Sequence, residues 1–185
     1  KSGIVSVPQT GEQNFREFDV VIYATGFKAQ DFLYPMEVSG TGGTKLADFW
    51  DGDAKAYATM MVPQFPNMFI MLGPNSGLAA NGSIIFMSEC QAHFIAQTLD
   101  LTERMGSRSV EVKVDAYEEF ANQMDAANVK RAWGVPGVST WYQNDKGRVS
   151  QNWPLELADY WNLTRTPNAQ HFEFSGQLAG DGNDR

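Results

Sequence analysis

An apolar run at residues 19–27 stands out in the hydrophobic pattern of the chain. It is rich in β-branched residues and ends in the small residues Ala24, Thr25 and Gly26. Continuous apolar runs of this length are typical of strands that are buried on both faces of a parallel sheet. Because ligands of open α/β sheets lie just beyond the carboxyl ends of such strands, the run predicts a binding site as well as a strand.

A second apolar run, at residues 68–72, also ends in a glycine-containing segment, residues 73–77. Two buried strands that end in glycine would open on one crevice. Residues 2–7 alternate roughly between apolar and polar, which predicts a hairpin whose return strand is the run at 19–27. Residues 34–64 are rich in turn formers and predict a long loop.

The longest predicted helix covers residues 83–105, with Asn81 or Ser83 as its cap and Gly106 as its stop. A short strand at 110–114 and a second helix at 115–131 follow. The predicted buried face of the long helix consists of apolar residues at near-helical spacing: Ile85, Ala92, Ile95, Ala96 and Leu99. Together these elements predict an α/β fold with a parallel sheet.

Composition narrows the possible classes of function. The chain has 185 residues and a net charge of -8, which argues against nucleic-acid binding but not against an anionic cofactor in a local positive field. The single cysteine excludes an internal disulfide and favours a reducing compartment, so we expect a cytoplasmic protein. No stretch approaches the roughly 20 apolar residues that span a bilayer. Since Lys1 is not a natural start residue, we expect a piece of a longer protein.

The start of the long helix is the strongest local signal of a site after the first apolar run. Unpaired amides and the helix dipole attract negative charge there, and the preceding loop of small residues, 73–82, would let a planar ligand approach the backbone. A plain glycine-rich turn into a helix is an equally good interpretation. Neither Gly40-Thr41-Gly42 nor Gly180-Asp181-Gly182 has the third glycine of a dinucleotide-binding loop.

Other reactive side chains favour structural roles. His93 and His171 are far apart in sequence, so a metal site is not expected. Cys90 is expected to pack in the core and Glu89 to be solvated. Trp141 offers an indole donor and a flat face to a ribose or a nicotinamide, although core packing explains it as well.

Four segments, taken in order, resemble the C-terminal part of class B flavoprotein monooxygenases, and specifically of Baeyer–Villiger monooxygenases. Residues 19–27 resemble that family's D-x-x-x-x-A-T-G segment, which an aromatic residue follows. Residues 65–78 resemble its F-P-N-L-F and G-P-N-S-G-L segments, and 89–91 its E-x-Q helix. Residues 139–154 are similar to its S-W-Y, G-R and W-P tail, and look closest to the 4-hydroxyacetophenone monooxygenase type.

The resemblance implies an enzyme that uses FAD, NADPH and oxygen, in which a flavin C4a-peroxide inserts one oxygen atom into a ketone to give an ester or lactone. It implies that residues 1–135 are the C-terminal half of an FAD-binding Rossmann-like domain. Residues 136–175 would be an aromatic-rich extension near the cofactors, and 176–185 a flexible tail. The implied partners are a small-molecule ketone and the N-terminal FAD- and NADP-binding segment of the same protein, with neither nucleic acid nor membrane.

The resemblance also assigns residues. Thr25 and Gly26 would lie at the junction of the FAD and NADP domains, and Trp141 would contact the nicotinamide ribose. The implied flavin contacts are Gly73, Asn75, Asn81, Gly82 and Ser83, and the implied substrate pocket is Leu78, Ala79 and Ala80. No catalytic residue is expected in this chain, because the family's active-site arginine, its glycine-rich dinucleotide loops and its fingerprint motif have no counterpart here.

The chain departs from the family pattern at two places, and two alternative functions remain. Gly137-Val138 stands where many members have a cysteine, and the 78–81 loop lacks a histidine that is common in relatives, which bears on substrate range. The alternatives are an N- or S-oxygenating flavin monooxygenase and a non-catalytic module that retains the scaffold.

Overall fold

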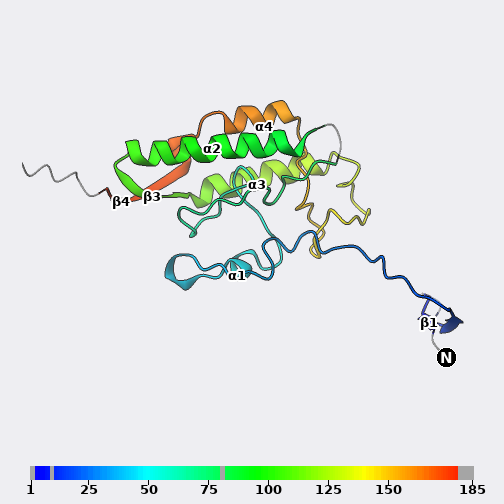
Figure 1. Ribbon diagram of the computed structural model, residues 1–185. Helices are drawn as coiled ribbons and strands as arrows, with labels where there is room; N and C mark the ends of the chain where they lie inside the picture. The colour runs from blue at the N-terminus through cyan, green and yellow to red at the C-terminus, as the bar shows by residue number, and fades with distance from the viewer. Residues whose placement is uncertain (1–2, 9–10, 80–81, 179–185) are drawn as a thin grey trace, which may run out of the picture.

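The computed structural model describes residues 3–8, 11–79 and 82–178. Figure 1 shows a helical body from which an N-terminal hairpin stands apart, joined to it by an extended segment. Its strands and helices are β1 (Gly3–Ser6), β2 (Asn14–Glu17), α1 (Leu46–Trp50), α2 (Ile84–Arg104), β3 (Ser107–Val112), α3 (Val114–Asn128), α4 (Leu157–Thr164) and β4 (Phe172–Gln177). Two 3-10 turns, η1 (Thr41–Gly43) and η2 (Ala169–His171), complete the order.

The sheets differ from those that the sequence predicts. The named strands form two antiparallel pairs, β1 with β2 and β3 with β4. The predicted parallel strand at 19–27 is wrong for this chain: the segment has no regular structure, with Ile22 84% and Phe27 98% exposed. A parallel strand needs hydrogen-bonded neighbours and cover on both faces, and the rest of the described chain supplies neither. The return strand of the hairpin is therefore β2.

The predicted strand at 68–72 is also wrong. This segment consists of turns, and Leu72 has a left-handed backbone with φ of 53°. Its amides bond to distant partners instead of to a neighbouring strand. Ile70 N donates to Met60 O, and Leu72 N donates to Gln91 Oε1. Ile70 is buried, whereas Met71 and Leu72 are 47% and 40% exposed, so the apolar pattern predicted neither the conformation nor the full burial of this segment.

Helix α2 confirms the predicted long helix and its limits. Ser83 caps its start by accepting a bond from Phe86 N, and Gly106 follows its end with φ of 67°. Most of the predicted buried face is wrong, since Ile85 is 69% and Leu99 50% exposed, although Ile95 is partly buried and packs against the core. The buried face instead carries both apolar and polar residues: Met87, Cys90, Gln91, Phe94, Thr98 and Thr102. Hydroxyls on it donate back to the helix, Thr98 to Phe94 O and Thr102 to Thr98 O, so hydrophobicity alone assigned the wrong face.

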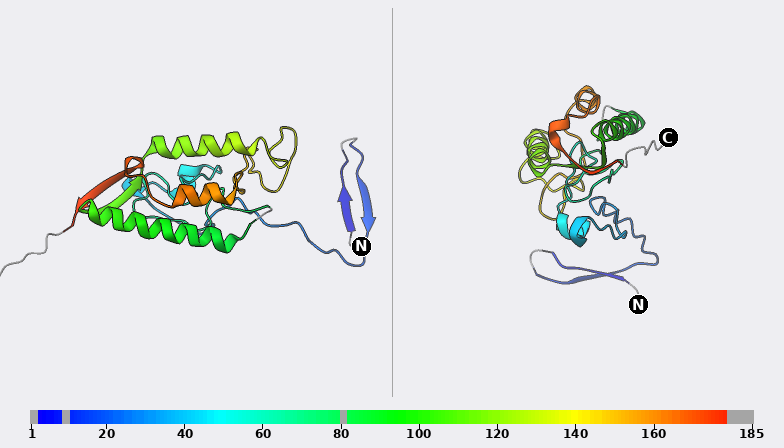
Figure 2. Two further views of the ribbon diagram at one scale, coloured as in Figure 1. Left: turned by 90° about the horizontal axis from the view of Figure 1, so that it is seen from above. Right: turned by 90° about the vertical axis from the view of Figure 1, so that its left-hand side faces the viewer.

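The core lies between α2, α3, the β3–β4 pair and a buried loop at residues 54–63. Figure 2 shows α4 beside α2, and α3 along another side of the same body. Strand β4 pairs with β3 and contributes Phe172 to this core, so the predicted C-terminal extension shares the core of the preceding residues. Strand β4 also runs to Gln177, beyond the predicted boundary at 175. In the part of the chain that is described, no helix is long and apolar enough to cross a bilayer.

Buried tyrosines give the fold a specific alkaline sensitivity. Burial, with a smaller contribution from the charge of Glu119, raises the pKa of Tyr57 to about 12. Burial also raises the pKa of Tyr117 and of Tyr160. An unfolded tyrosine ionises near a pKa of about 10, so the folded state holds protons that the unfolded chain releases. The stability from this difference is complete below about pH 10 and is lost as the pH rises through the folded pKa values.

We therefore expect the urea midpoint of unfolding to fall steeply between about pH 10 and pH 12. Tyr57→Phe will make that fall shallower, because one of the linked protons is removed. The measurement is urea denaturation at a series of pH values, followed by circular dichroism. A fall of the same slope in the variant would contradict the role of Tyr57.

Candidate functional site

Three helix ends meet at one end of the body: the start of α2, the end of α3 and the start of α4 (Figures 1 and 2). A cavity of about 340 Å³ lies there. Its lining joins three separate stretches of chain, namely Leu78 and Ala79, residues 130–133, and residues 153–157. The two described members of the predicted substrate pocket thus line one cavity, while Ala80 lies outside the described residues.

The start of α2 borders this cavity. Ser83 caps the third amide, which leaves the N–H groups of Ile84 and Ile85 without an acceptor inside the helix. The first turn carries no acidic side chain, so nothing in it opposes the positive end of the helix dipole. At Gly82, an added Cβ would lie 2.6 Å from Leu157 Cδ1 and 3.1 Å from Leu78 Cδ1. A side chain at this position would displace the ends of these two leucines, so α2 begins directly against the cavity wall.

The loop before α2 is held by backbone bonds to residues 149–153, which we call the tail. Asn75 N donates to Ser150 O at 2.7 Å, and Gly77 N donates to Gln151 O at 2.8 Å. Trp153 N returns a bond to Gly77 O at 2.8 Å. A Cβ at Gly77 would lie 2.8 Å from Gln151 O, so the small residues here serve a close approach of two backbones.

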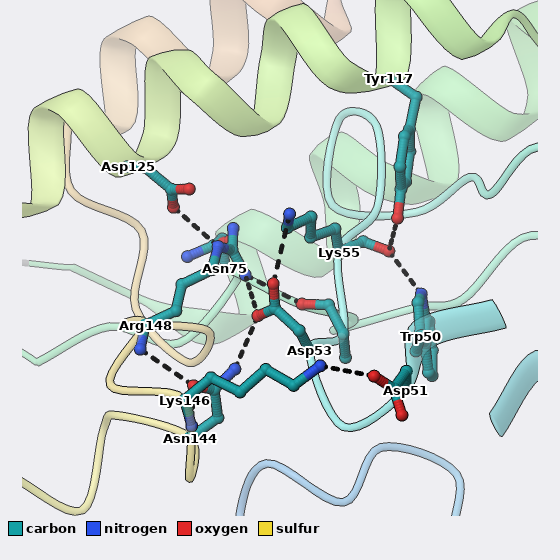
Figure 3. Close-up of polar contacts among 11 residues, drawn as sticks. Trp50, Asp51, Asp53, Lys55, Asn75, Tyr117, Asp125, Asn144, Lys146 and Arg148 are labelled. Atoms are coloured by element: carbon teal, nitrogen blue, oxygen red, sulfur yellow. Dashed lines mark hydrogen bonds and ion pairs between the residues drawn. The ribbon is translucent and has the colours of Figure 1, made fainter. Parts of the chain in front are cut away.

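Arg148 is the central side chain of a polar cluster that fixes this loop, as Figure 3 shows. The Arg148 side chain is only 11% exposed. Its Nε donates to Asp125 Oδ1 at 2.8 Å, its Nη1 donates to Ala54 O at 3.0 Å, and its Nη2 donates to Asn75 Oδ1 at 3.0 Å. Asn75 in turn donates to Val149 O and Asn152 O. One guanidinium therefore connects α3, the 54–55 segment, the 73–77 loop and the tail.

Burial and neighbouring positive charges have opposing effects on the carboxylates around Arg148. Burial raises the pKa of Asp125, although the adjacent Arg148 charge lowers it in part. Asp53 receives Lys55 Nζ at 3.2 Å and Asn144 Nδ2 at 2.6 Å, and lies 3.7 Å from Arg148 Nη1. At the exposed edge, the hydrogen bond and charge of Lys146 lower the pKa of Asp51. The cluster is saturated with protein partners, which makes it a structural centre rather than a site of chemistry.

The other predicted cofactor residues lie in different environments. Gly73 and Asn75 are buried, and the Asn75 side chain is fully used by protein contacts. Thr25 and Gly26 are exposed in the extended segment that leads to the hairpin, so the described chain does not bring them to the cavity. Asn81 lies outside the described residues.

Trp141 lies on the surface, since it is 60% exposed, and its ring contacts that of Tyr142 at 4.4 Å between centroids. The Gln30 side chain donates to its carbonyl. The alternative interpretation of Trp141 as a core residue is therefore wrong. Its role toward a nicotinamide remains a prediction.

The residues predicted to be structural have structural positions. Cys90 is buried and burial raises the pKa of its thiol, while Glu89 is exposed. His93 bonds the Arg165 carbonyl and His171 bonds the Tyr57 hydroxyl. Across the described ranges, no group of three potential metal ligands comes together.

Sequence reasoning missed the far wall of the cavity, which is formed by Arg131, Trp133, Trp153 and Leu157. Only the W-P pair at 153–154 gave a signal, and that signal was a family pattern rather than a spatial one. Residues 130–133 follow α3, some fifty residues from the 78–79 loop, and only the packing of the helices brings the two together.

No family model matches the chain. Curated relatives do. The chain is 34% identical over 166 residues to a protein of Sinorhizobium fredii named uncharacterized monooxygenase y4iD, which covers 88% of this chain and 25% of that protein. It is 32% identical over 166 residues to a Baeyer-Villiger monooxygenase of Pseudomonas aeruginosa, covering 89% of this chain and 31% of that protein.

Solved structures give the same result. The closed crystal structure of cyclohexanone monooxygenase matches with a TM-score of 0.68 and 28% identity, over 91% of this chain and 32% of that one. A cyclohexanone monooxygenase mutant from Rhodococcus sp. Phi1 bound to NADP+ matches with a TM-score of 0.68 and 27% identity, over 89% of this chain and 30% of that one. The chain thus spans between a quarter and a third of these relatives. In sequence and in its mixed α/β fold, the chain is similar to a part of the Baeyer–Villiger monooxygenases.

Proposed function

We propose that the complete protein is an FAD- and NADPH-dependent monooxygenase that inserts one oxygen atom of O2 into a ketone to give an ester or lactone. This chain supplies its C-terminal part. The observation that carries the proposal is the meeting of the α2 start, a loop of small residues and a cavity at one end of a chain whose relatives are monooxygenases.

The residues at the α2 start fit a flavin. Two unpaired amides, no acidic side chain and a glycine-containing approach suit the negative charge of a reduced flavin ring. Three consecutive residues of the tail beside Gly77 also have buried polar atoms without a partner in the described chain: Ser150 Oγ, Gln151 Oε1 and Asn152 Nδ2. Because these atoms are buried, a ligand group or a neighbouring segment would have to reach them for them to form a bond.

Specific residues would hold the cofactors. Gly82 and Ser83, with Asn81, would approach the flavin at the α2 start, and Gly73 would lie behind them. Asn75 would reach it only through its backbone carbonyl, because its amide and side chain are bonded to the tail and Arg148. Thr25 and Gly26 would join the FAD and NADP domains, and Trp141 would contact NADP. When bound, FAD supplies the electrons that activate O2.

The chain's own residues would shape and dry the reaction space. Leu78 and Ala79 form one wall of the cavity, and Trp153 and Leu157 form another. With the FAD- and NADP-binding segment over the cavity, these apolar side chains would help to exclude water, which protects a reactive oxygen species from hydrolysis. The amides of Ile84 and Ile85 would stabilise negative charge that develops near the helix start.

The FAD- and NADP-binding segment of the same protein would be the partner of the exposed apolar surface. That surface includes Ile22 and Phe27 in the extended segment, and Ile84 and Ile85 on α2. With neighbours from that segment, residues 19–27 would acquire the pairing and the cover that a buried parallel strand needs. The complete fold would then be the Rossmann-like FAD domain that the sequence predicts.

The experiment is an assay of the full-length protein. We expect it to purify yellow and to convert an aryl ketone such as 4-hydroxyacetophenone to an ester, with consumption of NADPH and O2. Oxygenation of an amine or a thioether in place of the ketone would identify the N- or S-oxygenating alternative. A full-length protein that binds no flavin would support a non-catalytic module. The 185-residue chain alone is expected to bind FAD weakly or not at all, and stoichiometric flavin in it would contradict that expectation.

A further inference from the structure

We propose that the cavity at the α2 start selects ketones that carry a carboxylate on an apolar or aromatic body. Calling the ligand a ketone rests on the proposed function, whereas the selection of an anion rests on the side chains of the cavity. Its volume of about 340 Å³ lies within the usual range of small-molecule sites.

The body of such a ligand would contact the apolar lining. Both cavity tryptophans have their polar atoms engaged elsewhere, since Trp153 Nε1 donates to Glu156 O at 3.1 Å and Trp133 Nε1 donates to Asn128 Oδ1 at 2.9 Å. Their indole N–H groups are therefore not available to a ligand. Leu78, Leu155 and Leu157 complete the apolar lining. Flat rings and branched aliphatic side chains together suit a compact ring system.

The carboxylate would meet two cations just after the end of α3. Arg131 Nε donates to Pro154 O at 2.5 Å, which fixes the guanidinium at the cavity. In the described residues the Lys130 ammonium has neither an ion pair nor a hydrogen bond, and it also lines the cavity. Charge-assisted hydrogen bonds from these groups would recognise an anion.

Glu156 also lines this cavity, and it forms an ion pair with Arg131 that offsets part of the positive charge. Its Oε1 lies 3.8 Å from Arg131 Nη2 and its side chain is 75% exposed, so solvent screens the pair. Its carboxylate already accepts a bond from the backbone of Asp159 in the cap of α4. Two cations and one carboxylate therefore line the cavity, which leaves it with a net positive charge from Lys130, unpaired among the described residues, in a chain whose net charge is -8.

The arrangement also orients the ligand. The cations follow α3, whereas the wall of Leu78 and Leu157 adjoins Gly82 at the α2 start. A ligand with its carboxylate on Lys130 and Arg131 would direct the opposite end of its body toward the α2 start, where the flavin is proposed to bind. The selected substrates would thus have the ketone and the acid at opposite ends.

The test compares 4-acetylbenzoate with its methyl ester, which differs in charge but keeps the ring and the ketone. Binding to the full-length flavoprotein is measured by calorimetry, and kcat/KM is measured for oxygenation of the same pair. We expect the acid to bind about 5- to 20-fold more tightly than the ester, as charge-assisted bonds at a partly exposed site allow. Lys130→Gln and Arg131→Gln will each reduce that preference, and added salt will reduce it further.

Arg104→Gln is the matched control, because it removes one positive charge from an exposed ion pair far along α2. It should leave the preference for the acid unchanged. Equal affinity for acid and ester, or an equal loss of preference in the control, would overturn the carboxylate site. Oxygenation of the ester without any preference for the acid would overturn this inference and leave the proposed function standing. Tight binding of the acid with no oxygenation of either ketone would support the carboxylate site and overturn the proposed function.

Discussion

Replacing Arg148 with alanine will lower the free energy of unfolding by about 3–5 kcal/mol. The guanidinium is 11% exposed and bonds Asp125, the Ala54 carbonyl and Asn75, with Asp53 nearby. Its removal leaves Asp125 partly buried without its closest cation, and leaves Asn75 Oδ1 without its donor. Urea denaturation of the chain, followed by circular dichroism, measures the loss.

Arg104→Ala provides the comparison for this prediction. Arg104 pairs with Asp100 on the surface of α2, with a side chain that is 63% exposed, so its loss should cost well under about 1 kcal/mol. If the two variants lose similar stability, the Arg148 cluster is not the structural centre that its geometry indicates. In the full-length protein, the Arg148 variant should also lose flavin, because Asn75 and the loop before α2 depend on that contact.

Replacing Gln91 with leucine will lower the free energy of unfolding by about 2–4 kcal/mol, since two bonds of a largely buried series of hydrogen bonds are lost. Gln91 Nε2 donates to Thr59 Oγ1 at 2.9 Å, and its Oε1 accepts from Leu72 N at 3.0 Å. The Tyr160 hydroxyl donates to Ala58 O at 3.1 Å, so at 2.7 Å it accepts from the Thr59 hydroxyl. The Gln91 amide, the Thr59 hydroxyl and the Tyr160 hydroxyl therefore each donate one bond and accept one, and the series ends at the Ala58 carbonyl.

Thermal and urea unfolding will report this loss, with Gln123→Leu as the comparison. Gln123 is on the exposed face of α3, and among the described side chains it bonds that of Glu119 alone, so its replacement should change stability by a few tenths of a kcal/mol. Leucine has nearly the volume of glutamine, which keeps the packing of α2 similar. A Gln91 variant as stable as the Gln123 variant would show that water replaces the lost bonds.

The predictions from sequence succeeded where local chemistry decides. The limits of α2 followed from Ser83 and from Gly106, because a cap and a left-handed stop act within a few residues. The order of the motifs identified the relationship to monooxygenases. The face of α2 could not be predicted, because its buried side includes Gln91, Thr98 and Thr102, whose burial depends on partners elsewhere in the chain.

The segment at 19–27 also shows that burial depends on partners outside the segment itself. Its sequence has the composition of a buried strand, yet its residues are exposed in this chain. A strand-like composition favours a strand only where neighbouring strands are available to pair with it.

By itself, the sequence determined where the long helix α2 begins and ends and which family the chain resembles. Only the tertiary structure decided that Arg148 fixes the loop before α2 and that Lys130 and Arg131 face Leu78 across one cavity. The physical reason is the range of the interactions. Caps and turns form between residues a few positions apart, whereas a buried charge cluster or a cavity wall forms between residues that only the packed core brings together.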